Sequence, residues 1–182
     1  ESGKYGKLLR LDMHRNGGFP GGWFRDVKRS GGALFDLHIH DLDFIQHMLG
    51  KPKSLISYGV VVESGGIDDS VTTYFYEDSV PLVTSAGSWT RSTFSASVAA
   101  VFEKGTLEIA GGKLVYYQMD KPVKEIKLPG KGNPYFNEIA YFADCVKRKR
   151  RPETATPEST RDTVAIIFKE QQSVKQKKKI VL

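Results

Sequence analysis

The stretch DLHIH at residues 36–40 holds an aspartate and two histidines, residue types that bind metals or transfer protons in many proteins. One hypothesis is a metal site of the kind found in metal-dependent hydrolases, with His38 and His40 as a His-x-His ligand pair. The other is a metal-free pair, in which the carboxylate of Asp36 supports the imidazole of His40 as an acid or base. The surrounding secondary structure distinguishes the two, because it fixes which side chains share a face.

Residues 33–49 have the pattern of a helix, and the GKP sequence at 50–52 carries the usual signals for its end. At about 100° per residue, the polar face of this helix holds four side chains: Asp36, His40, Asp43 and His47. His38 falls about 160° away from Asp36, among the apolar side chains of the opposite face. No histidine follows His47. We therefore expect no metal site, and we expect His38 to be a core histidine.

The remaining pair has a clear chemical use. A carboxylate one helical turn from an imidazole can hold its tautomer, and an imidazole titrating near neutral pH can take a proton from a substrate hydroxyl. Ser30, Gly31 and Gly32 place backbone amides just before the helix, where polar or anionic ligand groups are favoured. By spacing alone, however, Asp36 and His40 also fit a surface ion pair or a structural hydrogen bond, and both interpretations stay open.

β-Branched and aromatic residues predict strands on both sides of this helix. One strand is expected at 8–15, followed by a glycine-rich loop at 16–32. Seven more are expected after the helix, at 54–63, 69–77, 80–89, 94–103, 105–110, 113–119 and 123–128. EDSV (77–80), EKGT (103–106) and AGGK (110–113) have the composition of tight hairpin turns, so these connections are expected to be antiparallel.

Two helices are expected near the end of the chain. Asn133-Pro134 begins the first, which has an apolar stripe of Phe136, Ile139, Ala143 and Val146. Thr156-Pro157 begins the second, which runs to about Ser173, and KKIVL (178–182) is a candidate edge strand. We therefore predict a single α+β domain over residues 1–182, with a large, open, mainly antiparallel β-sheet and helices packed on one face.

Such a sheet has two faces, and three helices are too few to cover both. VTTYFY (71–76) and LVYYQM (114–119) place aromatic side chains on both faces. An uncovered apolar face of this size is normally buried against another subunit, so we expect a homo-oligomer, either a dimer or a tetramer. The alternative is a strongly curled sheet that buries its own face.

The composition is that of an ordinary globular domain, with 40% hydrophobic and 26% charged residues. Cys145 is the only cysteine, which excludes a disulfide within the chain and favours the cytoplasm. No apolar run is long enough to span a membrane. The basic runs at 147–151 and 175–179 lack interleaved aromatic residues and fit solvated helix ends, so no nucleic-acid partner is expected. Because ESGKYGKLL lacks an initial methionine and enters a strand at once, we expect a piece of a longer protein.

Three segments carry a resemblance to a known family. Residues 23–52, WFRDVKRSGGALFDLHIHDLDFIQHMLGKP, resemble the signature of the glucose-fructose oxidoreductase / inositol dehydrogenase / MocA (Gfo/Idh/MocA) family. That signature has a Trp, an acidic residue, Ser-Gly-Gly, Asp-x-x-x-His and Leu-Gly-x-Pro. Residues 67–89 are similar to the strand pair of the family that ends in Ser-Trp, and residues 135–173 to its two closing helices.

The resemblance covers the C-terminal of two domains, a dihydrodipicolinate-reductase-like fold, and implies an N-terminal Rossmann domain absent from this chain. It implies hydride transfer between NAD or NADP and a sugar, cyclitol or similar polyol. The Asp-x-x-x-His pair of the family falls on Asp36 and His40, with the histidine at the reacting hydroxyl. The candidate substrate-binding residues are Arg15, Trp23, Arg25, Asp26 and Asp43, and Gly31 and Gly32 are candidate cofactor contacts.

The sequence also departs from the family pattern. The family usually has glycine where His38 stands, so the local packing must differ. The glycine fingerprint G-x-G-x-x-G and the Glu-Lys-Pro segment with the catalytic lysine are absent, so this segment alone is expected to bind no dinucleotide and to be inactive. A non-catalytic dimerisation or ligand-sensing module of the same fold is the alternative. A His-x-His metal-dependent hydrolase is the third hypothesis.

Overall fold

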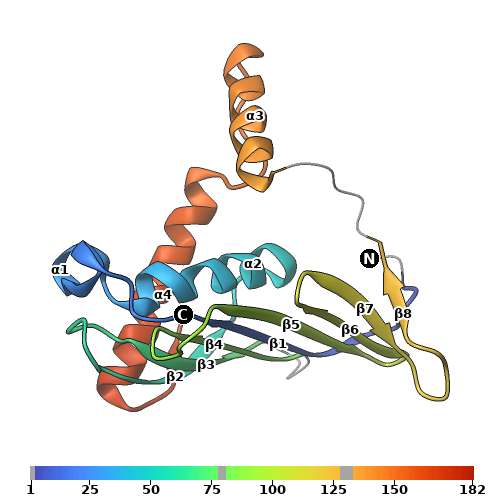
Figure 1. Cartoon of the computed structure of the whole chain (residues 1–182), viewed down its shortest axis with the longest axis horizontal. Helices are drawn as coiled ribbons and strands as arrows, with labels where there is room; N and C mark the ends of the chain where they lie inside the picture. The colour runs from blue at the N-terminus through green and yellow to red at the C-terminus, as the bar shows by residue number, and fades with distance from the viewer. Residues whose placement is uncertain (1–2, 78–80, 128–132) are drawn as a thin grey trace.

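The computed structural model describes residues 3–77, 81–127 and 133–182, and these form one large sheet with helices on one side (Figure 1). Within this part of the chain the sheet has nine strands in the order β8-β7-β6-β5-β1-β4-β3-β2-β9. The strands are β1 (Leu8–Asn16), β2 (Ser54–Val60), β3 (Asp69–Phe75), β4 (Leu82–Ser88), β5 (Ser95–Phe102), β6 (Gly105–Ala110), β7 (Lys113–Tyr117), β8 (Lys124–Ile126) and β9 (Ile180–Val181). The predicted α+β class, the open sheet and the C-terminal edge strand are confirmed.

The first strand occupies a place that the sequence did not predict. β1 lies at the centre of the sheet, where it pairs in parallel with β4 and antiparallel with β5. The other neighbouring strands are antiparallel, as expected. The continuous hairpin series expected from β2 to β8 is therefore interrupted between β4 and β5. The central place gives hydrogen-bond partners to the backbone along both edges of β1, which is buried at Leu11 and Met13, and a buried backbone needs such partners.

The turns of the β5–β7 region match the expectation from sequence. Gly111 and Gly112, between β6 and β7, have φ values of 59° and 77°. A two-residue hairpin turn with positive φ at both positions favours glycine, because a Cβ atom disfavours that conformation. The turn expected at 77–80 lies largely outside the described residues.

Three main helices follow the predicted positions. The helix predicted at 33–49 consists of a π-helical turn, η2 (Leu34–His38), followed directly by α2 (Ile39–Leu49). Asn133 caps α3 (Pro134–Lys147) and Thr156 caps α4 (Pro157–Gln176), each through a side-chain oxygen. The loop before η2 also holds a short 3₁₀ helix, η1 (Gly22–Arg25), and the single-turn α1 (Val27–Ser30), which were not predicted. Among these helices, none has the length and hydropathy needed to cross a bilayer.

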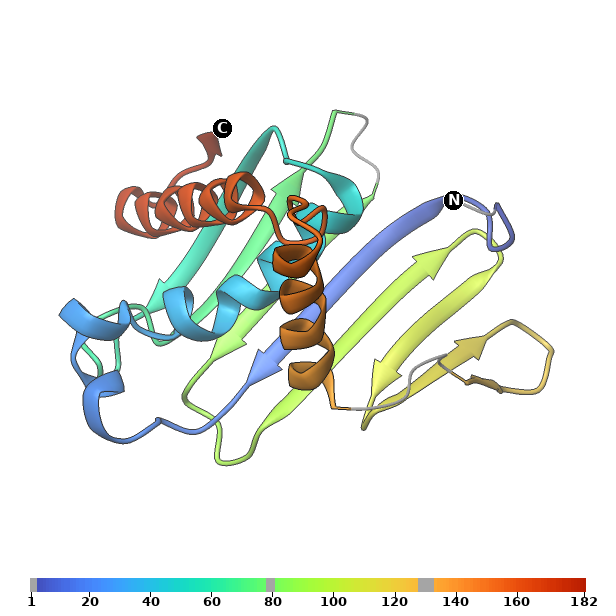
Figure 2. The same ribbon diagram turned by 90° about the horizontal axis from the view of Figure 1, so that it is seen from above.

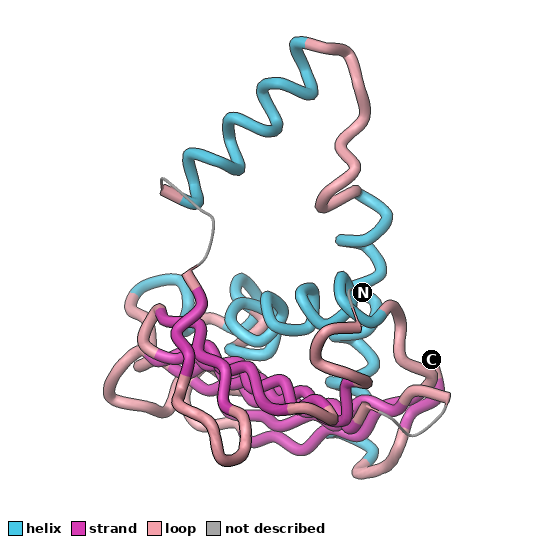
Figure 3. The backbone as a smooth tube through the Cα atoms, turned by 90° about the vertical axis from the view of Figure 1, so that its right-hand side faces the viewer, coloured by secondary structure: helices cyan, strands magenta, loops and turns pink. Residues whose placement is uncertain are grey.

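The helices cover only half of the sheet. α2 and α4 lie over the β1–β4 side, and β6, β7 and β8 extend beyond them (Figure 2). α3 stands away from the sheet altogether (Figures 1 and 3). The large side chains of its predicted apolar stripe are consequently 62–70% exposed, at Phe136, Ile139 and Val146. Tyr135 and Phe142 of the same helix are 74% and 61% exposed.

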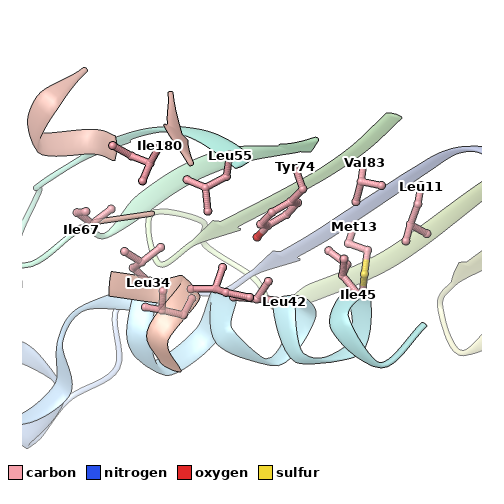
Figure 4. Close-up of a cluster of buried hydrophobic side chains, with 12 residues drawn as sticks. Leu11, Met13, Leu34, Leu42, Ile45, Leu55, Ile67, Tyr74, Val83 and Ile180 are labelled. Atoms are coloured by element: carbon pink, nitrogen blue, oxygen red, sulfur yellow. The ribbon is translucent and has the colours of Figure 1, made fainter. Parts of the chain in front are cut away.

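The core lies between α2, α4 and the β1–β4 half of the sheet (Figure 4). Leu42 and Ile45 of α2 and Leu11 and Val83 of the sheet are fully buried there. Burial of one such side chain contributes about 1.5–3 kcal/mol, so these contacts fix the face that α2 presents to the sheet.

The opposite face of the sheet carries no helix in the described residues. Tyr58, Val60 and Val71 point to this side and are 45–59% exposed. Along β2 and β3, this face of the sheet is therefore open in the described residues and is not buried by curling.

His38 is buried, as predicted from its place on the helix. The room for its ring comes from Gly87 on β4, where an added Cβ atom would lie 2.8 Å from the Cβ of His38 and 3.1 Å from its Nδ1. A histidine at this position of the helix thus depends on the absence of a side chain on the facing strand.

Gly87→Ala should destabilise the chain by about 1–3 kcal/mol, because the new methyl group overlaps a buried ring that has no free space to move into. Gly21→Ala is the matched control: Gly21 has a φ of −81° and no atom within 4 Å of an added Cβ. Urea unfolding of both variants measures the difference. Equal stability of the two variants would contradict the close packing of His38 against β4.

Candidate active site

The helix that carries DLHIH begins in a constrained way. Gly31 and Gly32 have φ values of 78° and 82°, and a Cβ on Gly32 would lie 2.9 Å from the carbonyl oxygen of Ile67. The two glycines therefore allow the chain to turn sharply beside the β2–β3 connection. Leu34 then donates its amide to Ile67, which fixes the first residue of the π-helical turn.

The two histidines of DLHIH lie on opposite sides of the helix, as predicted. His38 is fully buried, whereas His40 is exposed to solvent. Two imidazoles in these positions cannot bind one ion together. In the described part of the chain, no group of three or more His, Cys, Asp and Glu side chains has the arrangement of a metal site.

Asp36 and His40 lie near each other at the start of the helix. Partial burial raises the pKa of the Asp36 carboxyl above its ordinary value, and the charge of His40 offsets part of this rise. No hydrogen bond joins the two described side chains, so they interact through charge alone. The imidazole of His40 is exposed to solvent beside this carboxyl group.

Beside His40 the surface is hollowed. A depression of about 300 Å³ lies between α2 and the start of α4, and its lining includes Asp43, Thr154 and Ser159. Asp43 accepts a hydrogen bond of 2.8 Å from the hydroxyl of Thr163 on α4. Asp43 thus shares the polar face with His40, as predicted, and also joins α2 to α4.

A larger hollow, of about 760 Å³, lies elsewhere on the molecule. It is bordered by Tyr5, Tyr116 and the residues around β8. Its lining holds lysines and one glutamate but no histidine, aspartate or cysteine. Of these two hollows, the smaller one is lined by His40 and Asp43, which are residues predicted for the site.

Arg15 lies near the end of β1, and its side chain extends from the sheet to α2. Its Nε and Nη2 atoms donate to Oδ1 of Asp41 at 2.8 and 2.7 Å. Asp41 is buried, and its Oδ2 atom has no hydrogen-bond partner in the structure. Arg15 remains 27% exposed. It therefore anchors the first turn of α2 and also presents part of its guanidinium group to solvent.

The other three candidates for substrate binding lie in or beside η1. Trp23 is 43% exposed and stacks on Phe24 with ring centroids 4.0 Å apart. Arg25 forms an exposed ion pair with Glu63. Asp26 caps α1 by accepting the amide of Lys28. The structure gives each of them a local contact, and the guanidinium of Arg29 also lies 5.8 Å from the centroid of the Trp23 ring.

The amides of Gly31 and Gly32 are already used within the chain. Gly31 donates to the carbonyl of Val27, and Gly32 donates to the hydroxyl of Ser30. The expectation that bare amides before the helix would favour a ligand is therefore not met at these two positions. Their positive φ values give the glycines a structural role instead.

Two residues near the site were not singled out from the sequence. Asp41 falls on the buried side of α2, and Glu170 falls on the buried stripe of α4 with Thr163, Ile166 and Ile167. The available signal was a carboxylate on an otherwise buried stripe, since acidic residues are almost never fully buried unless they are paired.

With this geometry established, comparison with known proteins identifies the class. Aldose-aldose oxidoreductase from Caulobacter crescentus has a TM-score of 0.86 at 13% identity, over 99% of this chain and 57% of its own. An inositol dehydrogenase homolog from Azotobacter vinelandii, complexed with NAD⁺, has a TM-score of 0.80 at 17% identity, over 99% of this chain and 59% of its own. UDP-N-acetylglucosamine 3-dehydrogenase from Acidithiobacillus ferrooxidans has a TM-score of 0.79 at 18% identity, over 95% of this chain and 55% of its own. The chain has the fold of the C-terminal domain of these oxidoreductases.

The sequence itself places the chain in a family. The family model of the GFO/IDH/MocA C-terminal domain matches residues 1–112. The chain belongs to this family, which confirms the resemblance. It spans a little over half the length of the three solved structures. No match was found among curated protein sequences.

The raised pKa of Asp36 gives a testable pH dependence. A carboxyl group whose pKa is higher in the folded than in the unfolded chain stabilises the fold at low pH, and that stability is lost as pH rises through the folded pKa. We therefore expect the ¹³C shift of the Asp36 carboxyl to titrate above the ordinary value of about 4. Asp36→Asn should gain stability relative to the wild type as pH increases above this value.

The same titration tests the charge of His40. His40→Ala should raise the pKa of Asp36 further, because the offsetting positive charge is removed. An Asp36 pKa at or below the ordinary value, or one unaffected by His40→Ala, would contradict the arrangement described for this pair.

Proposed function

We propose that this chain is the substrate-binding and oligomerisation domain of an NAD(P)-dependent oxidoreductase that acts on a sugar, cyclitol or similar polyol. The observation that carries the proposal is the pairing of Asp36 with the exposed His40 at the start of α2, within a GFO/IDH/MocA C-terminal domain. The substrate class is supported by the names of three structural relatives: an aldose-aldose oxidoreductase, a homolog of inositol dehydrogenase and a UDP-N-acetylglucosamine dehydrogenase.

In this function, the nicotinamide cofactor supplies or accepts the hydride. Nε2 or Nδ1 of His40 takes the proton of the substrate hydroxyl as the carbon is oxidised, and returns it in the reverse direction. Asp36 lies close enough to stabilise the imidazolium that forms. Trp23 and the exposed part of Arg15 offer an apolar surface and hydrogen-bond donors for the ring and hydroxyls of a polyol.

The two glycines that were candidates for cofactor contact offer no free backbone amide to a dinucleotide. The amides of Gly31 and Gly32 are internally bonded, and the sequence lacks G-x-G-x-x-G. We propose that an N-terminal Rossmann domain binds the cofactor and that this chain alone is inactive. The additional length of the solved relatives, one of them complexed with NAD⁺, supports this division of roles.

The coding sequence upstream of residue 1 tests this proposal directly. A glycine fingerprint between a strand and a helix, together with a Glu-Lys-Pro lysine, is expected for an oxidoreductase. A fingerprint without that lysine would instead favour a non-catalytic module of the same fold. NAD⁺ and NADP⁺ titrations of the longer protein would then show which dinucleotide it binds.

In the intact protein, His40→Ala should lower kcat/KM by about 10²–10⁴-fold, the usual loss for an acid–base group. The dinucleotide Kd serves as a control, because the cofactor site is proposed to lie on the other domain. Thermal melting checks that the variant is folded. Wild-type turnover in His40→Ala would contradict the catalytic assignment.

The open sheet face is the proposed oligomer interface. Val71→Lys would place a charge beside Tyr58 and Ala86 at the centre of the β2–β4 part of this face. Since burying an unpaired charge is unfavourable, the variant should dissociate to monomers at protein concentrations where the wild type is a dimer or tetramer. Gln176→Lys, exposed at the end of α4, adds the same charge away from the sheet. Light scattering after gel filtration measures both, and an unchanged mass for Val71→Lys would exclude this face.

A further inference from the structure

A sealed polar cluster lies beneath the start of the catalytic helix. Nε2 of His38 is 3.0 Å from Oε2 of Glu170 and 3.2 Å from the hydroxyl of Tyr74. Tyr74 donates to Oε1 of Glu170 at 2.8 Å, and Thr72 donates to Oε2 at 3.0 Å. All four residues are at most 1% exposed. Among the described residues, their only other polar side-chain partners are Ser57, 2.7 Å from the hydroxyl of Thr72, and Ser85, 3.5 Å from Nδ1 of His38.

The protons of this cluster can be assigned from its geometry. The single hydroxyl proton of Tyr74 is donated to Glu170, so the two oxygens that face Nε2 of His38 offer only lone pairs to it. Nε2 must therefore carry a proton. Burial alone would lower the pKa of the His38 imidazole, but the charge and hydrogen bond of Glu170, with the charge of Asp41, outweigh it and raise the pKa.

Acidic and basic side chains alternate beneath the start of the helix, in the order Arg15, Asp41, His38 and Glu170. Around the His38 ring, the charged or titratable groups are Asp41 on α2, Glu170 on α4 and Tyr74 on β3, and Asp41 is in turn paired with Arg15 on β1. Buried charges are tolerated when each has a partner, and removal of one partner leaves the other uncompensated. The cluster thus joins one helical turn to three other elements.

We propose that His38 is a positioning residue, whose buried ion pair with Glu170 holds the π-helical turn in the register that brings Asp36 and His40 together. His38 ends that turn and stands two residues from each of them. π-Helical turns are rare and occur frequently at functional sites, so this one needs contacts that hold it in place. The role in catalysis, though not the role in geometry, rests on the function proposed above.

The test measures the interaction between Asp36 and His40 directly, as the rise in the Asp36 pKa caused by His40→Ala. Glu170→Gln keeps the shape of the side chain but removes its charge, and should reduce that rise by half or more. Tyr74→Phe is the matched control, because it removes one hydrogen bond to Glu170 from the same cluster but leaves the charge pair intact. It should preserve the rise. ¹⁵N titration of the His38 ring should give a lower pKa in Glu170→Gln than in the wild type or in Tyr74→Phe, because the charge of Glu170 raises it.

General destabilisation cannot mimic this result, since Tyr74→Phe also weakens the core. An Asp36–His40 interaction as strong in Glu170→Gln as in the wild type would overturn the proposal. Equal loss of the Asp36–His40 interaction in Glu170→Gln and Tyr74→Phe would also overturn it. If Glu170→Gln fails to fold, His38→Gln removes the same ion pair from the other side, with an amide that still donates to Glu170, and carries the same expectation.

Kinetics of the intact protein separate this proposal from the proposed function. Displacement of a reacting group by about 1 Å can cost roughly 100-fold in rate, so Glu170→Gln should lower kcat at least tenfold, with a smaller change in KM. Tyr74→Phe should retain most of the turnover. Loss of activity in His40→Ala with wild-type kcat in Glu170→Gln contradicts the positioning role alone. Wild-type activity in His40→Ala contradicts the proposed function, whereas the titration above still decides the role of His38.

Discussion

Burial of one side of η2 and α2 against the sheet is the constraint on which the position of every candidate site residue depends. Leu34, Leu42 and Ile45 are completely buried, and each contributes about 1.5–3 kcal/mol relative to an exposed position. A rotation of the helix by one residue would expose several of them at once. The exposed face that carries Asp36 and His40 is therefore set by apolar packing on the other side.

That packing leaves two ionisable groups inside, and each is compensated by a different part of the fold. Asp41 is paired with Arg15 from the central strand β1, and His38 is paired with Glu170 from α4. An isolated charge in such a place would be strongly unfavourable, so the pairs fix the helix against elements distant in sequence. None of these four residues is a proposed proton-transfer group, yet the two pairs determine where Asp36 and His40 lie.

The sequence was informative wherever local rules decide the structure. Helix periodicity separated His38 from His40, and cap and turn residues such as Thr156 and Gly112 placed the element ends. The central position of β1 could not be predicted, because it depends on pairing with β4 and β5 far along the chain. The π-helical turn and the Glu170–His38 pair depend likewise on packing between distant segments. Asp36 and His40 were found from spacing, but their assignment to catalysis came from the family resemblance.

The exposed position of His40 has a physical consequence for the proposed reaction. Charge interactions at a solvated surface are weak, and they strengthen several-fold when water is excluded. Asp36 and His40 interact here through charge without a hydrogen bond, so enclosure by a second surface is what would make the pair effective. The exposed apolar side chains of α3 and the greater length of the solved relatives both fit a protein in which another domain closes over this side. In the proposed function, the chain supplies the proton-transfer groups, held in place from within, and the proposed N-terminal domain holds the cofactor that carries the hydride and excludes water from those groups.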